Sequence, residues 1–88
     1  MSLTEALELL GSARLYVRQG EEIVSRQRKL IDSLERFGHD PTQDIVILEQ
    51  LEQMQSQYMH HRDRVEREVL RLLKPEADSD ELDEDIRP

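Results

Sequence analysis

Two neighbouring histidines, His60 and His61, are the side chains of this 88-residue chain best suited to carry chemistry. On a helix, adjacent side chains point about 100° apart, so this pair cannot bind one metal ion as histidines at i and i+4 do. A single exposed histidine on a four-helix bundle could instead accept a phosphoryl group, with Arg62 and Arg64 nearby in the sequence. The competing interpretation is that His61 lines the contact between two helices and His60 is solvated, because a surface histidine has many reasons to exist.

Arginines form a second candidate site. If the chain folds back on itself, arginines of a first helix approach those of a second and make a basic surface able to contact phosphate groups or another anionic ligand. Acidic residues interleave with these arginines, no aromatic platform accompanies them, and the pI is near 4.8. Nucleic acid is therefore an unfavourable partner, and pairing with neighbouring carboxylates is the competing interpretation. The arginines of this interaction surface are Arg14, Arg18, Arg62, Arg64, Arg67 and Arg71.

The chain carries no recognisable motif for catalysis, nucleotides or metals. Its three glycines stand apart, which excludes a glycine-rich phosphate loop, and it has no cysteine, which excludes disulfides, thiolate metal sites and thiol catalysis. Long helices without a cleft cannot desolvate a carboxylate pair and separate its pKa values. We therefore expect no enzymatic activity, no catalytic residue, no cofactor and no metal. The lack of cysteine fits a cytoplasmic protein, and the longest apolar run, residues 45–48, is far too short to cross a membrane.

Two long helices must position these side chains. Between residues 3 and 37, apolar residues repeat every seven positions in neighbouring rows, a pattern that favours left-handed coiled-coil packing. Ser2 and Glu5 have capping-box spacing and predict the start of the first helix, although Ser12 offers a second start. The first row is Leu3, Leu10, Val17, Val24 and Ile31; the second row, directly beside it, is Leu9, Tyr16, Ile23, Leu30 and Phe37; a third row of mostly small residues is Ala6, Ala13, Gly20, Gln27 and Leu34.

The segment after Phe37 predicts a tight turn between two helices. Gly38 suits the left-handed conformation that ends a helix. Asp40 suits an N-cap, Pro41 suits the first helical position, and Gln43 completes the spacing of a capping box. Helices joined by about three residues must lie antiparallel. The predicted turn residues are Gly38, His39, Asp40, Pro41 and Gln43.

A second helix is predicted from Pro41 to about residue 73, again with a sevenfold apolar repeat. Folding the chain about the turn pairs positions whose numbers sum to about 79. This register sets Gly20 opposite Tyr58 in the seam between the helices, a small residue against a large one. The central row of the second helix is Leu51, Tyr58, Val65 and Leu72.

Together these patterns predict an all-α fold, an antiparallel two-helix coiled-coil hairpin over residues 1–74 with helices at about 3–37 and 41–73 and a turn at 38–40. The doubled apolar rows of the first helix leave a flank that needs cover, so we expect a dimer that forms a four-helix bundle. The expected function is protein–protein interaction, either homotypic or as an adaptor for another helical protein. Candidates for the second packing surface are Leu7, Ile45, Met59 and Leu70.

Residues 75–88 hold seven acidic residues and one arginine, and so carry most of the formal net charge of −8. Two prolines and few apolar residues predict a disordered acidic tail. This tail would leave the fold near the arginines and compete with an anionic ligand for them.

Residues 20–31, 34–40 and 61–65 resemble a family of small, uncharacterised helical-hairpin proteins of proteobacteria. The recurring features of that family are an Ile-x-x-Gln-Arg segment, a Gly-His-Asp turn and a final His-Arg-like segment. The resemblance covers about residues 18–70; it implies the hairpin and its turn, and it brings no activity. The residues to which it draws attention are Gln27, Arg28, Gly38, His39 and Asp40.

Overall fold

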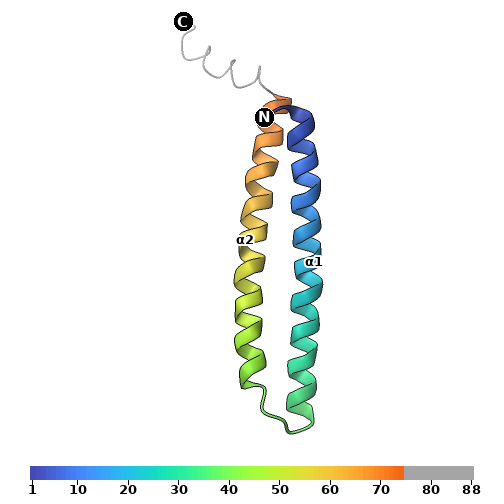
Figure 1. The fold of residues 1–88 in the computed structure, drawn as a ribbon, viewed down its shortest axis with the longest axis vertical. Coiled ribbons are helices and arrows are strands. Elements are labelled where there is room, and N and C mark those ends of the chain that lie inside the picture. Colours follow the sequence, from blue (N-terminus) through green and yellow to red (C-terminus); the bar gives the residue numbers. More distant parts are fainter. Residues whose placement is uncertain (75–88) are drawn as a thin grey trace, which may run out of the picture.

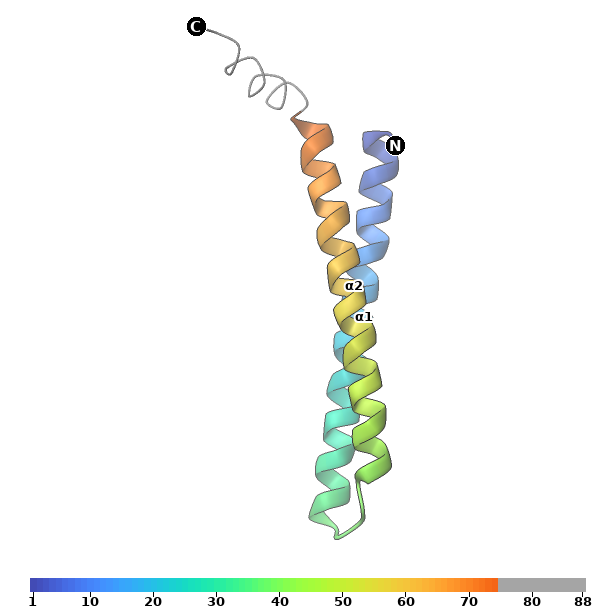
Figure 2. The same cartoon turned by 90° about the vertical axis from the view of Figure 1, so that its left-hand side faces the viewer.

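The computed structural model of the chain describes residues 1–74, which form two long helices joined by a short turn. α1 spans Leu3–Arg36 and α2 spans Thr42–Leu73. The helices run antiparallel, side by side, and cross at a shallow angle, as Figures 1 and 2 show together. We call the end at residues 37–41 the turn end, and the end where α1 begins and α2 finishes the open end. The predicted all-α hairpin is confirmed, and neither described helix has a stretch long and apolar enough to span a membrane.

α1 begins at the capping box that the sequence predicts. The backbone N–H of Ser2 donates to the Glu5 carboxylate (2.9 Å), and the backbone N–H of Glu5 donates to the Ser2 hydroxyl (3.1 Å). The two bonds satisfy N–H groups that the helix start would otherwise leave unpaired. They also lower the pKa of Glu5, because the ionised carboxylate is the better acceptor. The helix continues through Gly11 and Ser12, so the alternative start at Ser12 is not used.

Gly38 ends α1 as predicted. Its φ of 78° is the left-handed conformation that a residue without a Cβ adopts at little cost. The N–H of Gly38 donates to the carbonyl of Glu35 (3.2 Å), and the N–H of His39 donates to the carbonyl of Leu34 (2.8 Å). These are the paired bonds of a Schellman motif, which satisfies carbonyls at the end of a helix.

The start of the second helix differs from the predicted one, because Pro41 and not Asp40 is the N-cap residue and no side chain caps it. The Asp40 carboxylate accepts hydrogen bonds from the hydroxyl (2.6 Å) and the backbone N–H (3.0 Å) of Thr42, and these bonds lower the pKa of Asp40. α2 therefore begins at Thr42 and not at Pro41. Within residues 1–74, the Gln43 side chain makes no hydrogen bond, so the predicted capping box is not formed.

The core is a single seam between the helices, and its best-covered part lies at the open end. From Ala6 to Val24, the buried residues of α1 are spaced alternately by four and three, the pattern of a coiled coil, and Ile31 follows seven residues later. No large side chain within residues 1–74 is completely buried, so the seam is thin. The buried residues of α1 are Ala6, Leu10, Ala13, Val17, Gly20, Val24 and Ile31. The main cluster consists of Ala6, Leu10, Val65 and Val69, with Leu3 and Leu72 packed against it.

The register of the two helices differs from the predicted one by about one turn. A Cβ atom built on Gly20 would overlap the side-chain amide of Gln55, so Gln55 and not Tyr58 lies opposite Gly20. Tyr58 lies beside this contact and stacks on Tyr16. The reason is shape: the space left by Gly20 admits a slim amide, whereas the phenol ring packs at the side of the seam against a second ring.

The predicted acidic tail, residues 75–88, lies outside the described residues.

Candidate functional site

One flank of the hairpin carries a long row of exposed apolar side chains. The second row of α1 precedes the buried seam residues by one position, and so it lies at the side of the seam. The exposed fraction runs from 36% for Leu9 to 74% for Phe37. On α2, Ile47 and Met54 are also exposed and are spaced by seven. We call this surface the apolar flank; it consists of Leu9, Tyr16, Ile23, Leu30, Phe37, Ile47 and Met54.

Both helices contribute to the middle of the apolar flank. The rings of Tyr16 and Tyr58 are stacked, with their centroids 5.7 Å apart and their planes 23° apart. Ile23 and Met54 line a shallow hollow beside the same two rings. A stacked pair at this separation adds about 1 kcal/mol beyond the area that it buries. The rings therefore give the flank a well-packed centre.

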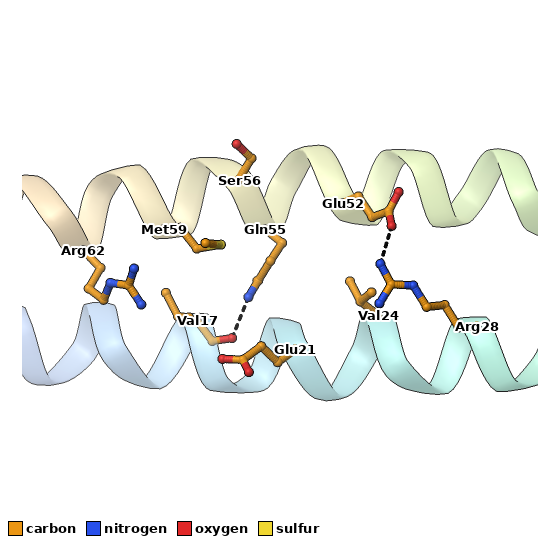
Figure 3. A pocket seen from close by; sticks show the side chains of 9 residues that line it. All are labelled: Val17, Glu21, Val24, Arg28, Glu52, Gln55, Ser56, Met59 and Arg62. Carbon is orange, nitrogen blue, oxygen red and sulfur yellow. Dashed lines mark hydrogen bonds and ion pairs between the residues drawn. The ribbon is translucent and has the colours of Figure 1, made fainter.

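The opposite flank is closed by ion pairs between the helices. Arg14 Nη2 lies 3.2 Å from Glu66 Oε2, and Arg28 Nη2 lies 2.6 Å from Glu52 Oε2. We call this surface, with the groove between the two pairs, the ionic flank. Figure 3 shows the groove from close by, with the Arg28–Glu52 pair at one end. The groove is lined by Val17, Glu21, Val24, Arg28, Glu52, Gln55, Ser56, Met59 and Arg62.

Two glutamines tie the helices together through backbone carbonyls in the seam. Gln55 Nε2 donates to the carbonyl oxygen of Val17 (2.8 Å), as drawn in Figure 3, and Gln27 Nε2 donates to that of Asp44 (2.9 Å). Within the described residues, Gln55 Oε1 is buried and has no hydrogen-bond partner. An unpaired buried acceptor costs about 1–3 kcal/mol, which offsets the bond that the same amide makes. We infer that Gln55 contributes mainly to the register of the helices.

The two flanks differ in how much charge an apolar partner would bury on covering them. Leu7, Ile45, Met59 and Leu70, the expected second packing surface, are exposed by 39% to 55%. Met59 and Leu70, however, line hollows together with charged side chains of the ionic flank. Covering those hollows would take ion pairs out of water, which costs several kcal/mol per ion. On the apolar flank, charged side chains line the hollow beside Leu9 at the open end, whereas the hollow beside Ile23 and Met54 has none, so a helical partner can cover that part without the penalty.

The six predicted arginines do not form one surface. Arg14 lines a hollow with Leu10 on the ionic flank, whereas Arg64 lines a hollow with Leu9 and His61 on the other side of the seam. Arg14 on α1 and Arg64 on α2 therefore lie on opposite sides of the seam, although both are near the open end.

Pairing with carboxylates, the competing interpretation for these arginines, holds for three of the six. Arg14 pairs with Glu66, as described above, and the remaining two pairs are within α2. Arg62 Nη2 lies 3.0 Å from Asp63 Oδ1, and Arg71 Nη2 lies 2.6 Å from Glu68 Oε2. The hydrogen bond from Arg71 lowers the pKa of Glu68. The other three, Arg18, Arg64 and Arg67, are exposed.

The histidines do not converge with other reactive groups. His60 and His39 are exposed, and His61 is half-buried in the hollow beside Leu9. No group of three or more metal-ligating side chains comes together within residues 1–74. Among residues 1–74, the carboxyl groups with a shifted pKa are those of Glu5, Asp40 and Glu68, and all three are shifted downward. A carboxyl that acts as a general acid at neutral pH needs the opposite shift.

Sequence reasoning missed the seam position of Gln55. A signal was available, because Gln55 lies seven residues after Leu48 and seven before Arg62, at the spacing of the seam rows. Its polarity concealed that role, because the predicted rows of the seam on the second helix consist of apolar residues.

No family model, no curated protein and no solved structure matches this chain. The likeness to the proteobacterial hairpin family therefore stays a prediction. Val24 stands three positions before Gln27, where that family's segment has isoleucine.

Proposed function

We propose that this chain is a non-catalytic protein–protein interaction module that acts through helix packing, and that two copies associate into a four-helix bundle. The observation that supports this proposal is the apolar flank. Four of its members lie on α1 and Phe37 follows directly after it; the five repeat every seven residues, and α2 leaves each of them at least 36% exposed. A solvated helix face has no physical reason to keep large apolar side chains at that interval, whereas a packed face requires them.

The face of the hairpin that carries the flank is large enough for a stable interface. α2 has 32 residues, so the hairpin is about 48 Å long. Two helices with axes 8–10 Å apart present a strip about 20 Å wide, which gives on the order of 1,000 Å² per hairpin. A standard protein interface buries about 800 Å² per partner. One face of a second hairpin has the length and width to cover the strip.

The charge pattern favours a second copy as that partner. In a two-fold contact, residues near the axis meet the same residues of the other copy, so like charges there repel. The middle of the apolar flank holds Tyr16, Ile23 and Met54, and its hollow is bordered by Gln19; all are uncharged. In the middle of the flank, self-association therefore brings no charged residue against its own copy.

Two leucines of equal exposure provide the test. Leu30 and Leu15 both lie on α1 and are both 45% exposed, but only Leu30 belongs to the apolar flank. Leu15 lies on the outer face of α1, midway between the seam residues Ala13 and Val17. We expect Leu30→Glu to be monomeric at concentrations where the wild type and Leu15→Glu are dimers, as measured by light scattering after size exclusion. Circular dichroism checks that all three are helical. Equal masses for both variants would contradict the proposal.

A further inference from the structure

The two helices bury the apolar residues of the seam to different extents along the hairpin. Both buried residues of α2, Val65 and Val69, lie near the open end. From Thr42 to Arg64, α2 has no buried residue, although this part contains many of its large apolar side chains. The turn half of the hairpin is therefore the part whose apolar surface its own two helices cover least.

The apolar flank shows the same asymmetry. Ile23 and Leu30 of α1, Phe37 directly after it, and Ile47 and Met54 of α2 form its turn half, and each is at least 42% exposed. Toward the open end the flank becomes polar. The hollow beside Leu9 is lined by three ionisable side chains, His61, Arg64 and Glu68.

We propose that the two copies in the bundle run in the same direction, with both turns at one end, so that the turn half of one apolar flank covers the turn half of the other. This inference rests on the proposed function. A two-fold axis parallel to the hairpin then sets α1 of one copy against α2 of the other, which brings Leu30 into the same layer as the partner copy's Ile47. The turn halves then cover apolar surface with apolar surface, and the polar open ends lie together at the other end of the bundle.

The opposite direction is disfavoured by desolvation. If two hairpins overlapped along their whole length in opposite directions, the two-fold axis would cross them and set α2 against α2, with Ile47 over Glu68 of the other copy. There Ile47 would bury Glu68 against an apolar surface that offers no hydrogen bonds. The turn half of each flank would then cover the charged open end of the other copy and not its apolar surface.

The chain has no cysteine, so a single introduced cysteine carries a spin label at one site. His39→Cys places the label at the turn and Glu8→Cys places it near the open end; both residues are exposed and neither belongs to the apolar flank. Electron–electron dipolar spectroscopy then measures the distance between the two labels of each dimer. The mass of every labelled sample is measured first.

For copies that run in the same direction, we expect both distances to lie below about 40 Å, because only the width of a four-helix bundle and two label arms separates the labels. Opposite directions with full overlap put the turn labels about 50 Å or more apart. Opposite directions with only the turn halves overlapped put the open-end labels about 60 Å or more apart. Either long distance in a dimer overturns the shared direction and leaves the proposed function standing. A monomeric wild type overturns both.

Discussion

The ring of Tyr16 on α1 stacks on the ring of Tyr58 on α2, with the two centroids 5.7 Å apart, at the centre of the apolar flank. The contact joins the helices beside the seam position where Gly20 leaves room for the Gln55 amide. Tyr16 remains 53% exposed although it is stacked. Its outer surface is thus fixed in place and still available to a partner, the combination that interface anchors share.

Truncation of Tyr16 should therefore weaken dimer formation strongly. We expect Tyr16→Ala to raise the dimer dissociation constant at least about tenfold, because central aromatic anchors typically contribute about 2 kcal/mol or more. Leu15→Ala is the matched control, since it shortens the next exposed side chain of α1 outside the flank. Sedimentation equilibrium over a dilution series measures both constants. Equal constants for the two variants would count against a central role for the ring.

The contact between Gly20 and Gln55 predicts opposite outcomes for two glycines of one helix. Leucine at Gly11 meets nothing within 4 Å of its Cβ position and gains about 0.8 kcal/mol of helix propensity. Leucine at Gly20 must expel the Gln55 amide and overfill the seam, which typically costs about 1–3 kcal/mol. We expect Gly11→Leu to raise the free energy of unfolding and Gly20→Leu to lower it, as measured in urea. A stable Gly20→Leu protein would contradict the register.

The turn should tolerate little change at Gly38. Its φ of 78° places any side chain at this position in a strained backbone conformation, and an alanine there would carry a penalty of about 1–2 kcal/mol. Gly38→Ala should therefore lower the melting temperature, whereas Gly11→Ala, in mid-helix with open space around it, should raise it. Calorimetry at one protein concentration compares the two. A shift in the same direction for both would show that the Schellman turn does not limit stability.

The lowered carboxyl pKa values predict loss of stability in acid. The pKa of Asp40 is lowered in the folded state by the bonds from Thr42. Asp40 therefore contributes to the free energy of unfolding above the ordinary carboxyl pKa of about 4. This contribution is lost as the pH falls through the lowered pKa of the folded state. Asp40→Asn keeps an acceptor oxygen but cannot titrate. Between about pH 5 and pH 3, its melting temperature should fall less than that of the wild type. An equal fall in melting temperature for the variant and the wild type would contradict the role given to the Asp40 carboxylate.

Both ends of α1 could be predicted from sequence, because caps are local. Ser2 with Glu5 and the glycine at position 38 carry their hydrogen-bond partners within a few residues, and the structure forms those bonds. The register could not be predicted in the same way. A sevenfold repeat looks alike after a shift of one heptad and nearly alike after a shift of one turn, so periodicity alone does not distinguish Tyr58 from Gln55 opposite Gly20. The contact between Gly20 and Gln55 depends on side-chain shape, which the pattern does not contain.

The arginines show a second limit of sequence reasoning. Their helical faces follow from spacing, but an arginine side chain reaches several ångströms beyond its Cα, so the partner that it finds depends on the other helix. Arg14 finds Glu66, 52 positions away in the chain. The α1 row of the apolar flank follows directly from the seam beside it. The predicted candidates for the second packing surface, Leu7, Ile45, Met59 and Leu70, are nevertheless not members of this flank.

The mass of the wild-type protein in solution, measured by light scattering at low and at high salt over a dilution series, tests the central claim most directly. The chain mass is 10.4 kDa. A bundle held by the apolar flank predicts twice that mass at high concentration, and the dimer should persist at high salt because salt screens charges and does not weaken apolar packing. A protein that stays at the chain mass under all these conditions would contradict the dimer. A dimer that dissociates on addition of salt would show that charges, and not the apolar flank, hold the two copies together.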